Sequence, residues 1–174
     1  LKVCWRWPKM MSKDRGTASA DRNKPINEMT LIFPSLSRNE SFARVVAASF
    51  VSQLDPSVEE LSDVRTAVSE AVTNAIIHGY ENETGIIKMV CLLYEDSVEI
   101  TVIDEGKGIE NIELARQPLY TSKPDMERSG MGFTVMETFM DEVKVESEVG
   151  KGTKVTMIKY FDSVKGKDRT KNNK

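Results

Sequence analysis

The sequence predicts an α+β fold in two layers, with a mixed, largely antiparallel sheet that helices cover on one face. The predicted strands follow one another mostly in hairpin order, not in alternation with helices, which favours antiparallel pairing. Two stretches with helical spacing of apolar residues supply the covering layer. A chain of 174 residues, 40% of them hydrophobic, is enough for one domain with a sizeable core.

A short strand and two helices are expected first. Residues 29–33 have the composition of a strand. Capping boxes at residues 37–40 and 57–60 predict two helix starts, because a Ser and a Glu at this spacing each accept a hydrogen bond from the other's backbone N–H. Apolar residues then recur at helical spacing up to Leu54 in the first helix, and the second is expected to end near Gly79.

The second half of the domain is expected to contain two hairpins and one helix. The stretch from residue 104 to 132 is rich in Gly, Pro and charge, and so long a stretch within a domain is usually functional. The predicted elements are strands 86–94 and 98–103, a helix at 133–140, and strands 142–149 and 153–160.

Charge separates three parts of the chain. Residues 1–25 hold seven basic and two acidic residues, and residues 163–174 hold five basic and one acidic. Residues 26–162, in contrast, hold twelve basic and twenty-four acidic residues. We expect residues 1–25 to be an extension outside the fold, residues 26–162 to be the domain, and residues 163–174 to be a solvated basic tail. The acidic domain disfavours a nucleic-acid partner and suits a basic protein surface, although solubility also explains such a charge.

Composition excludes several other classes of protein. No apolar run approaches the ~18 residues of a membrane span, so we expect no membrane association. Cys4 and Cys91 lie too far apart to indicate a disulfide framework, which fits the cytoplasm. His78 is the single histidine, so zinc chemistry with several imidazole ligands is excluded.

Glu70 and Asn74 form the first candidate pair. They lie four residues apart on the predicted second helix, so both project from one face. The amide oxygen of Asn74 suits Mg²⁺, which takes few protein ligands, and the Glu70 carboxylate could accept a proton from an attacking hydroxyl. Alone, the pair is also typical of an ordinary helix surface.

The second candidate is Asp-Glu-Gly-Lys-Gly, directly after a predicted strand. Gly106 and Gly108 allow a ligand to approach the backbone. Asp104, if buried, would accept a hydrogen bond from the exocyclic amine of adenine and repel the carbonyl of guanine. A turn between strands explains the same residues.

The third candidate precedes the predicted helix at 133–140. Gly130 and Gly132 lie where free backbone N–H groups and the helix dipole suit a phosphate. Thr121, Ser122 and Lys123 could add hydroxyl and ammonium contacts. A connector between elements is the alternative, and a hairpin turn fully explains the further Gly-Lys-Gly-Thr at 150–153.

In this order and spacing, the candidates resemble the GHKL ATPase superfamily. The chain lacks the GxxxxGK[ST] of P-loop proteins and the HRD and DFG sequences of ordinary protein kinases. Residues 39–44, 69–80, 116–124 and 127–133 resemble the small anti-sigma serine kinases, and within them the sporulation group that acts on a sigma-F type factor. This similarity extends over roughly residues 27–160.

The resemblance implies the two-layer GHKL (Bergerat) fold, with ATP or ADP and Mg²⁺ as ligands. It implies a homodimer that holds a sigma factor of the sigma-F type inactive and uses ATP to phosphorylate a serine of an anti-anti-sigma protein. Glu70 would be the general base, Asn74 would hold Mg²⁺ and Asp104 would recognise adenine. Arg44 matches a partner-contacting arginine, although it could also be an ordinary surface residue. The glycines that would shape the pocket or close over the phosphates are Gly106, Gly108, Gly130 and Gly132.

Two classes of function remain open at this point. One is a serine protein kinase, and the other is a binding module whose ATP only sets the shape that holds a sigma factor. A stress-response relative would keep this chemistry and act on a different sigma factor. A histidine kinase is disfavoured, because His78 ends the predicted ATP-site helix, where we expect it to pack or cap.

Overall fold

A computed structural model describes residues 24–81, 83–117, 131–162 and 164. Its helices and strands do not alternate regularly along the chain, as expected. In order they are β1 (Asn27–Pro34), α1 (Arg38–Val51), a 3-10 turn (Ser52–Leu54), α2 (Val58–Asn74), a π-helical turn (Ala75–Gly79), β2 (Ile86–Leu93), β3 (Ser97–Asp104), α3 (Ile112–Ala115), α4 (Gly132–Phe139), β4 (Glu142–Glu148) and β5 (Gly152–Tyr160).

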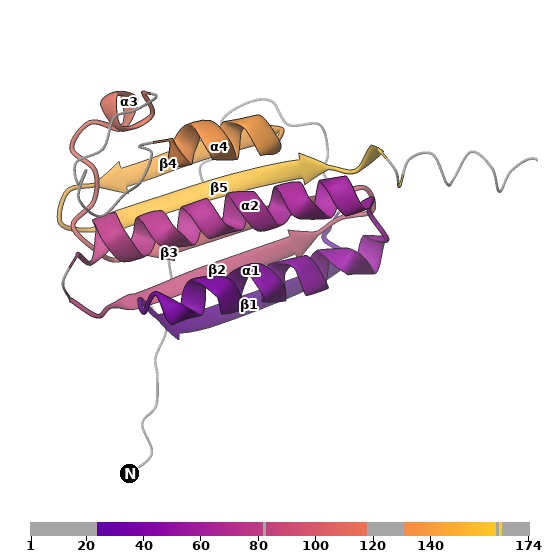
Figure 1. The fold of residues 1–174 in the computed structure, drawn as a ribbon, viewed down its shortest axis with the longest axis horizontal. Helices are drawn as coiled ribbons and strands as arrows, with labels where there is room; N and C mark the ends of the chain where they lie inside the picture. Colours follow the sequence, from indigo (N-terminus) through magenta and orange to yellow (C-terminus); the bar gives the residue numbers. More distant parts are fainter. Residues whose placement is uncertain (1–23, 82, 118–130, 163, 165–174) are drawn as a thin grey trace, which may run out of the picture.

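The strands form one five-stranded sheet in the order β1-β2-β3-β5-β4. Helices α1, α2 and α4 lie side by side on one face of this sheet, so the molecule has two layers (Figure 1). The predicted α+β fold is confirmed. All four pairings between the described strands are antiparallel, so the sheet is more uniform than the mixed one expected.

The hydrophobic core fills the space between the sheet and the helices. Along β2, Ile87 and Met89 are fully buried and alternate with partly exposed residues, as in a strand with one covered face. On α2, the stripe Val64, Val68 and Val72 is also fully buried. The packing of this stripe on the sheet fixes the side of α2 that faces away from the core, and thereby positions the polar residues near its C-terminal end.

The two predicted capping boxes have different outcomes. At Ser57 the box is present: the Glu60 N–H donates to the Ser57 hydroxyl at 3.2 Å, and the Ser57 N–H donates to the Glu60 carboxylate at 2.7 Å. At Ser37 the prediction is wrong, because the Ser37 backbone is itself helical and its side chain accepts no capping bond. Glu40 instead accepts a hydrogen bond from the Ser69 hydroxyl at 2.5 Å, which joins α1 to α2.

The sequence did not indicate α3. This short helix lies in the Gly-rich stretch after β3, and Asn111 begins it by accepting a hydrogen bond from the Leu114 N–H at 2.9 Å. The expected extension and tail lie outside the described residues except for Lys24, Pro25 and Val164. In the described part of the chain, no helix is long and apolar enough to cross a membrane.

Candidate functional site

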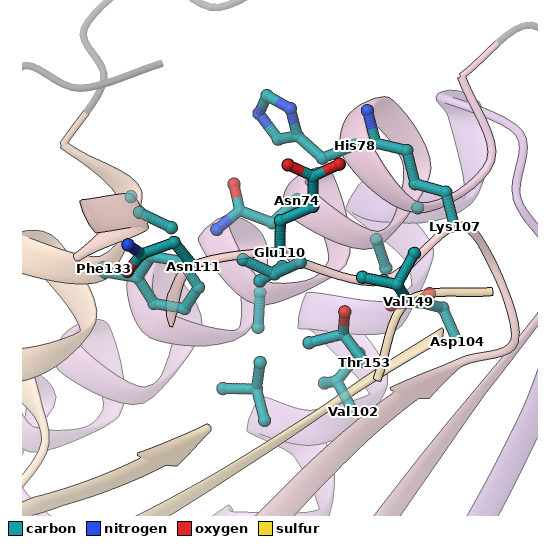
Figure 2. Close-up of a pocket in the computed structure, with 18 of the residues that line it drawn as sticks. Asn74, His78, Val102, Asp104, Lys107, Glu110, Asn111, Phe133, Val149 and Thr153 are labelled. Atoms are coloured by element: carbon teal, nitrogen blue, oxygen red, sulfur yellow. The ribbon is translucent and has the colours of Figure 1, made fainter. Parts of the chain in front are cut away.

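A pocket of about 460 Å³ opens beside the C-terminal part of α2. Its walls come from α2, the ends of β3 and β5, the loops that join these strands to the rest of the chain, and both α3 and α4. Figure 2 shows Asn74 at the end of α2 and His78 on the π-helical turn that follows it, with Val102, Asp104 and Thr153 at the strand ends. This volume is typical of a site for a small organic ligand.

One buried carboxylate, that of Asp104, lines the pocket at the end of β3, and Thr153 of β5 lies next to it. Asp104 is only 5% exposed, and its Oδ1 accepts a hydrogen bond from the Gly106 N–H at 3.0 Å. Burial raises the pKa of Asp104, while hydrogen bonds from the backbones of Gly106 and Thr153 act in the opposite direction. Apolar residues that line the same pocket include Ala71, Ala75, Val102 and Val155.

The loop after Asp104 is fixed by contacts between backbones. A Cβ at Gly106 would lie 2.1 Å from the carbonyl oxygen of Gly79, so no side chain fits there. Gly108 has a left-handed φ of 73°, and a Cβ there would lie 2.2 Å from the carbonyl oxygen of Glu148. Gly108 lines the pocket, and at both glycines the close neighbour that excludes a side chain is the backbone of another segment of the protein.

Helix α2 brings Glu70 and Asn74 to the start of α4. A Cβ at Gly132 would lie 3.0 Å from the Asn74 amide nitrogen and 3.3 Å from a Glu70 carboxylate oxygen. Asn74 and Gly132 line the pocket, and Glu70 lies directly beside them at its edge. Along α2 the order is therefore Glu70, Asn74 and then Gly79, whose backbone abuts the Asp104 carboxylate.

Four of the predicted site residues line the pocket, namely Asn74, Asp104, Gly108 and Gly132, and Glu70 and Gly106 lie beside it. Thr121, Ser122, Lys123 and Gly130 lie outside the described residues. Arg44 is on α1, where it forms an ion pair with Glu40 (Nε to Oε1, 3.6 Å) and a hydrogen bond to Ser41. Arg44 is not among the residues that line the pocket, so any role in partner binding belongs to a different surface.

The sequence prediction missed several residues that line the pocket. Thr153 was attributed to a hairpin turn, although its Gly-x-Gly-Thr context was noted, and in the sheet it pairs directly with Asp104. Lys107, between Gly106 and Gly108, forms an ion pair with Glu81. The cap position of Asn111, followed by apolar residues, was a signal for α3. The other missed lining residues are His78, Gly79, Glu110, Leu114, Ala115, Phe133 and Val149.

These residues fit an aromatic base at one end and an anionic group at the other. A buried carboxylate in apolar surroundings can accept a hydrogen bond from an exocyclic amine. The backbone N–H groups at the start of α4 can face an anion. Among the described residues no three His, Cys, Asp or Glu side chains gather as a metal site, so Mg²⁺ here would depend on Asn74 and on oxygens of a bound phosphate.

A family of known proteins matches most of the chain. The histidine kinase-like ATPase domain family matches residues 33–159. A solved structure of RsbU and RsbW domains from Mycobacterium tuberculosis superposes with a TM-score of 0.57 and 18% identity, over 79% of this chain and 32% of that one. The chain thus spans about a third of that protein, and the likeness supports the fold alone.

Curated relatives match over nearly their whole length. An anti-sigma F factor of Clostridium acetobutylicum is 64% identical over 135 residues, which are 78% of this chain and 94% of the relative. One from Anoxybacillus flavithermus is 58% identical over 140 residues, which are 80% of this chain and 96% of the relative. The chain therefore belongs to the anti-sigma F factor family, within the histidine kinase-like ATPase domains.

Proposed function

We propose that this protein is an anti-sigma factor of the sigma-F type and an ATP-dependent serine kinase that phosphorylates an anti-anti-sigma protein. Membership of the anti-sigma F factor family supports the first part. The pocket beside α2, together with the ATPase description of the matching family, supports nucleotide binding. The proposed site of action is the cytoplasm, with the protein acting as a homodimer.

In this proposal the adenine base enters the apolar end of the pocket. Asp104 accepts a hydrogen bond from its exocyclic amine, and Val102 and Val155 contact its ring. The fixed loop around Gly106 holds the Asp104 carboxylate in place, because the Gly106 N–H donates to Oδ1. The base end of the pocket is therefore organised before a nucleotide arrives.

The phosphates then lie toward the start of α4. Asn74 offers an amide oxygen to Mg²⁺, which when bound neutralises phosphate charge. The first N–H groups of α4, beginning at Gly132, face the same region. Thr121, Ser122, Lys123 and Gly130 remain proposed phosphate contacts.

The observation that carries the kinase proposal is the position of Glu70. Its carboxylate lies beside both Asn74 and Gly132, at the pocket edge where the phosphates would end. From there it can accept the proton of a substrate serine while that hydroxyl attacks phosphorus, provided that the serine approaches from solvent. Asn74, one turn along the helix, keeps the phosphate group aligned.

The test is transfer of γ-labelled phosphate from Mg-ATP to a candidate anti-anti-sigma protein. Wild type and Glu70→Gln are compared, and Glu59→Gln serves as the control because Glu59 is an exposed acid in the first turn of the same helix. We expect acid-stable label on the partner with wild type and with Glu59→Gln, and a loss of at least a hundredfold with Glu70→Gln.

Three results would change the proposal. If Glu70→Gln and Glu59→Gln lose phosphate transfer to the same extent, Glu70 has no specific role as the base. ATP binding without transfer would favour a module whose nucleotide only controls binding. Acid-labile label on this chain itself would indicate a histidine kinase.

The anti-sigma part has a separate test on α1. Arg44→Ala is expected to weaken binding to a sigma factor of the sigma-F type by about tenfold, because arginines often dominate protein interfaces. Arg65→Ala, an exposed arginine on α2, is the matched control. Equal affinities of the two variants in a titration would exclude Arg44 from the interface.

A further inference from the structure

An ion pair joins α3 to α4 beside the pocket. Arg116, the residue after α3, directs two nitrogens at one carboxylate oxygen of Glu137 on α4, with Nε at 2.7 Å and Nη2 at 2.5 Å. Both side chains are partly exposed. None of the roles described above uses this pair.

Helix α3 has few other contacts that could hold it in place. It has four residues, none of which is buried. Its internal support is the cap, in which the Asn111 side chain accepts a hydrogen bond from the Leu114 N–H, and a few backbone hydrogen bonds such as that from the Arg116 N–H to the Ile112 carbonyl at 3.0 Å. Among the described residues, no other helix or strand packs extensively against α3. Segments with so little buried surface open at low free energy.

The position of α3 nevertheless determines one wall of the pocket. Asn111, Leu114 and Ala115 line it from α3, and Phe133 lines it from α4. Figure 2 labels Asn111 and Phe133 among the side chains that line the pocket. Glu137 lies four residues after Phe133, so both project from the same side of α4. The ion pair therefore connects the two walls where they meet.

We propose that Arg116 is a positioning residue, which through Glu137 holds α3 against α4 and keeps this wall over the bound nucleotide. The inference rests on the proposed nucleotide binding. If the pair is broken, α3 moves away from the pocket more often, and bound nucleotide leaves faster. Because the core does not depend on α3, the stability of the whole domain should hardly change.

The measurement is the dissociation rate of a fluorescent ADP from the full-length chain, chased with excess ADP. The variants are Arg116→Gln, Glu137→Gln and the exchanged pair Arg116→Glu with Glu137→Arg. Glu146→Gln is the control, since Glu146 is an exposed acid paired with Lys144 and Lys154 on the sheet. We expect each single variant to release ADP about 2–5 times faster, as for a partly exposed pair, and the exchanged pair to restore most of the difference.

The outcomes separate this inference from the proposed function. Dissociation at the wild-type rate in both single variants would overturn the positioning role. Faster release that the exchanged pair does not restore, with a clear fall in melting temperature, would make Arg116 a structural residue only. No binding of ADP by wild type would overturn the proposed nucleotide site, and this inference with it.

Discussion

The two walls of the pocket are built in different ways. On the side of α2 and the strands, loops are locked backbone to backbone: the Lys107 N–H donates to the Gly79 carbonyl at 2.9 Å, and the Gly150 N–H donates to the Lys107 carbonyl at 2.7 Å. On the other side, α3 has no buried residue and is held by a cap, a few backbone hydrogen bonds of its own single turn and an ion pair to α4. The firm wall holds Asp104, the group that would select the ligand, and under our proposal the weakly held wall would control access to the pocket. Substitutions in the two walls should therefore separate stability from binding.

The largest effect is expected from Gly106→Ala in the firm wall. Its new methyl group would lie 2.1 Å from a backbone carbonyl oxygen, which cannot move as a flexible side chain could. We expect a loss of about 3 kcal/mol or more in unfolding free energy, measured by urea titration. Gly150→Ala is the matched control: φ is 78° there, but nothing lies within 4 Å, so the cost should be about 1 kcal/mol.

Asp104→Asn should weaken nucleotide binding by about 10–100-fold, because it replaces a charged acceptor by a neutral amide. Its effect on stability depends on pH. Burial raises the pKa of Asp104 above its value in the unfolded chain. Between these two pKa values the folded state binds more protons than the unfolded state. The free energy of unfolding of the wild type therefore falls as pH rises through this range. The variant lacks this decline. Its melting temperature relative to wild type should therefore increase from pH 4 to pH 7, and a constant difference would contradict this account.

Ser57→Ala tests the anchoring of α2, the helix of the firm wall. Loss of the capping bond should cost about 1 kcal/mol in unfolding free energy. Ser37→Ala is the natural comparison, because the same sequence pattern at α1 forms no cap, and it should cost less than about 0.5 kcal/mol. Equal costs in denaturant titrations would mean that the Ser37 side chain has a role that the structure does not reveal.

The smallest effect on stability is expected from Asn111→Ala in the weakly held wall. The cap of a four-residue helix without buried residues should contribute less than about 0.5 kcal/mol to unfolding of the domain. Nucleotide affinity should still fall a few-fold in a titration, since Asn111 lines the pocket. A large fall in melting temperature would show that α3 belongs to the core after all.

The sequence predicted the firm wall better than the weak one. The stripe on α2 and the alternation in β2 are periodic, and burial of one face decides such elements. Glu70, Asn74 and Asp104 could be found because each has a fixed spacing within a periodic element or at its end. Spacing could not predict that these residues lie around one pocket, because that requires α4 to pack on α2. Only the resemblance predicted it.

The misses have local physical causes. A capping box needs an extended backbone at the cap, and at Ser37 the backbone is already helical, so Glu40 binds Ser69 instead. Helix α3 is too short to show a period. Thr153 follows Gly150 and Gly152, a pattern that predicts a turn, whereas its position in the pocket follows from the strand register that pairs it with Asp104.

That pairing also has a consequence for how the chain folds. The hairpins β2-β3 and β4-β5 are local, but β3 and β5 must meet across the whole stretch that carries α3 and α4. Closing so long a loop costs conformational entropy, so we expect β3 and β5 to pair later than the two local hairpins. The floor of the pocket thus exists only after the sheet is complete. A ligand that fills it binds the native state alone, and at 100 times its Kd would stabilise that state by about 2.7 kcal/mol.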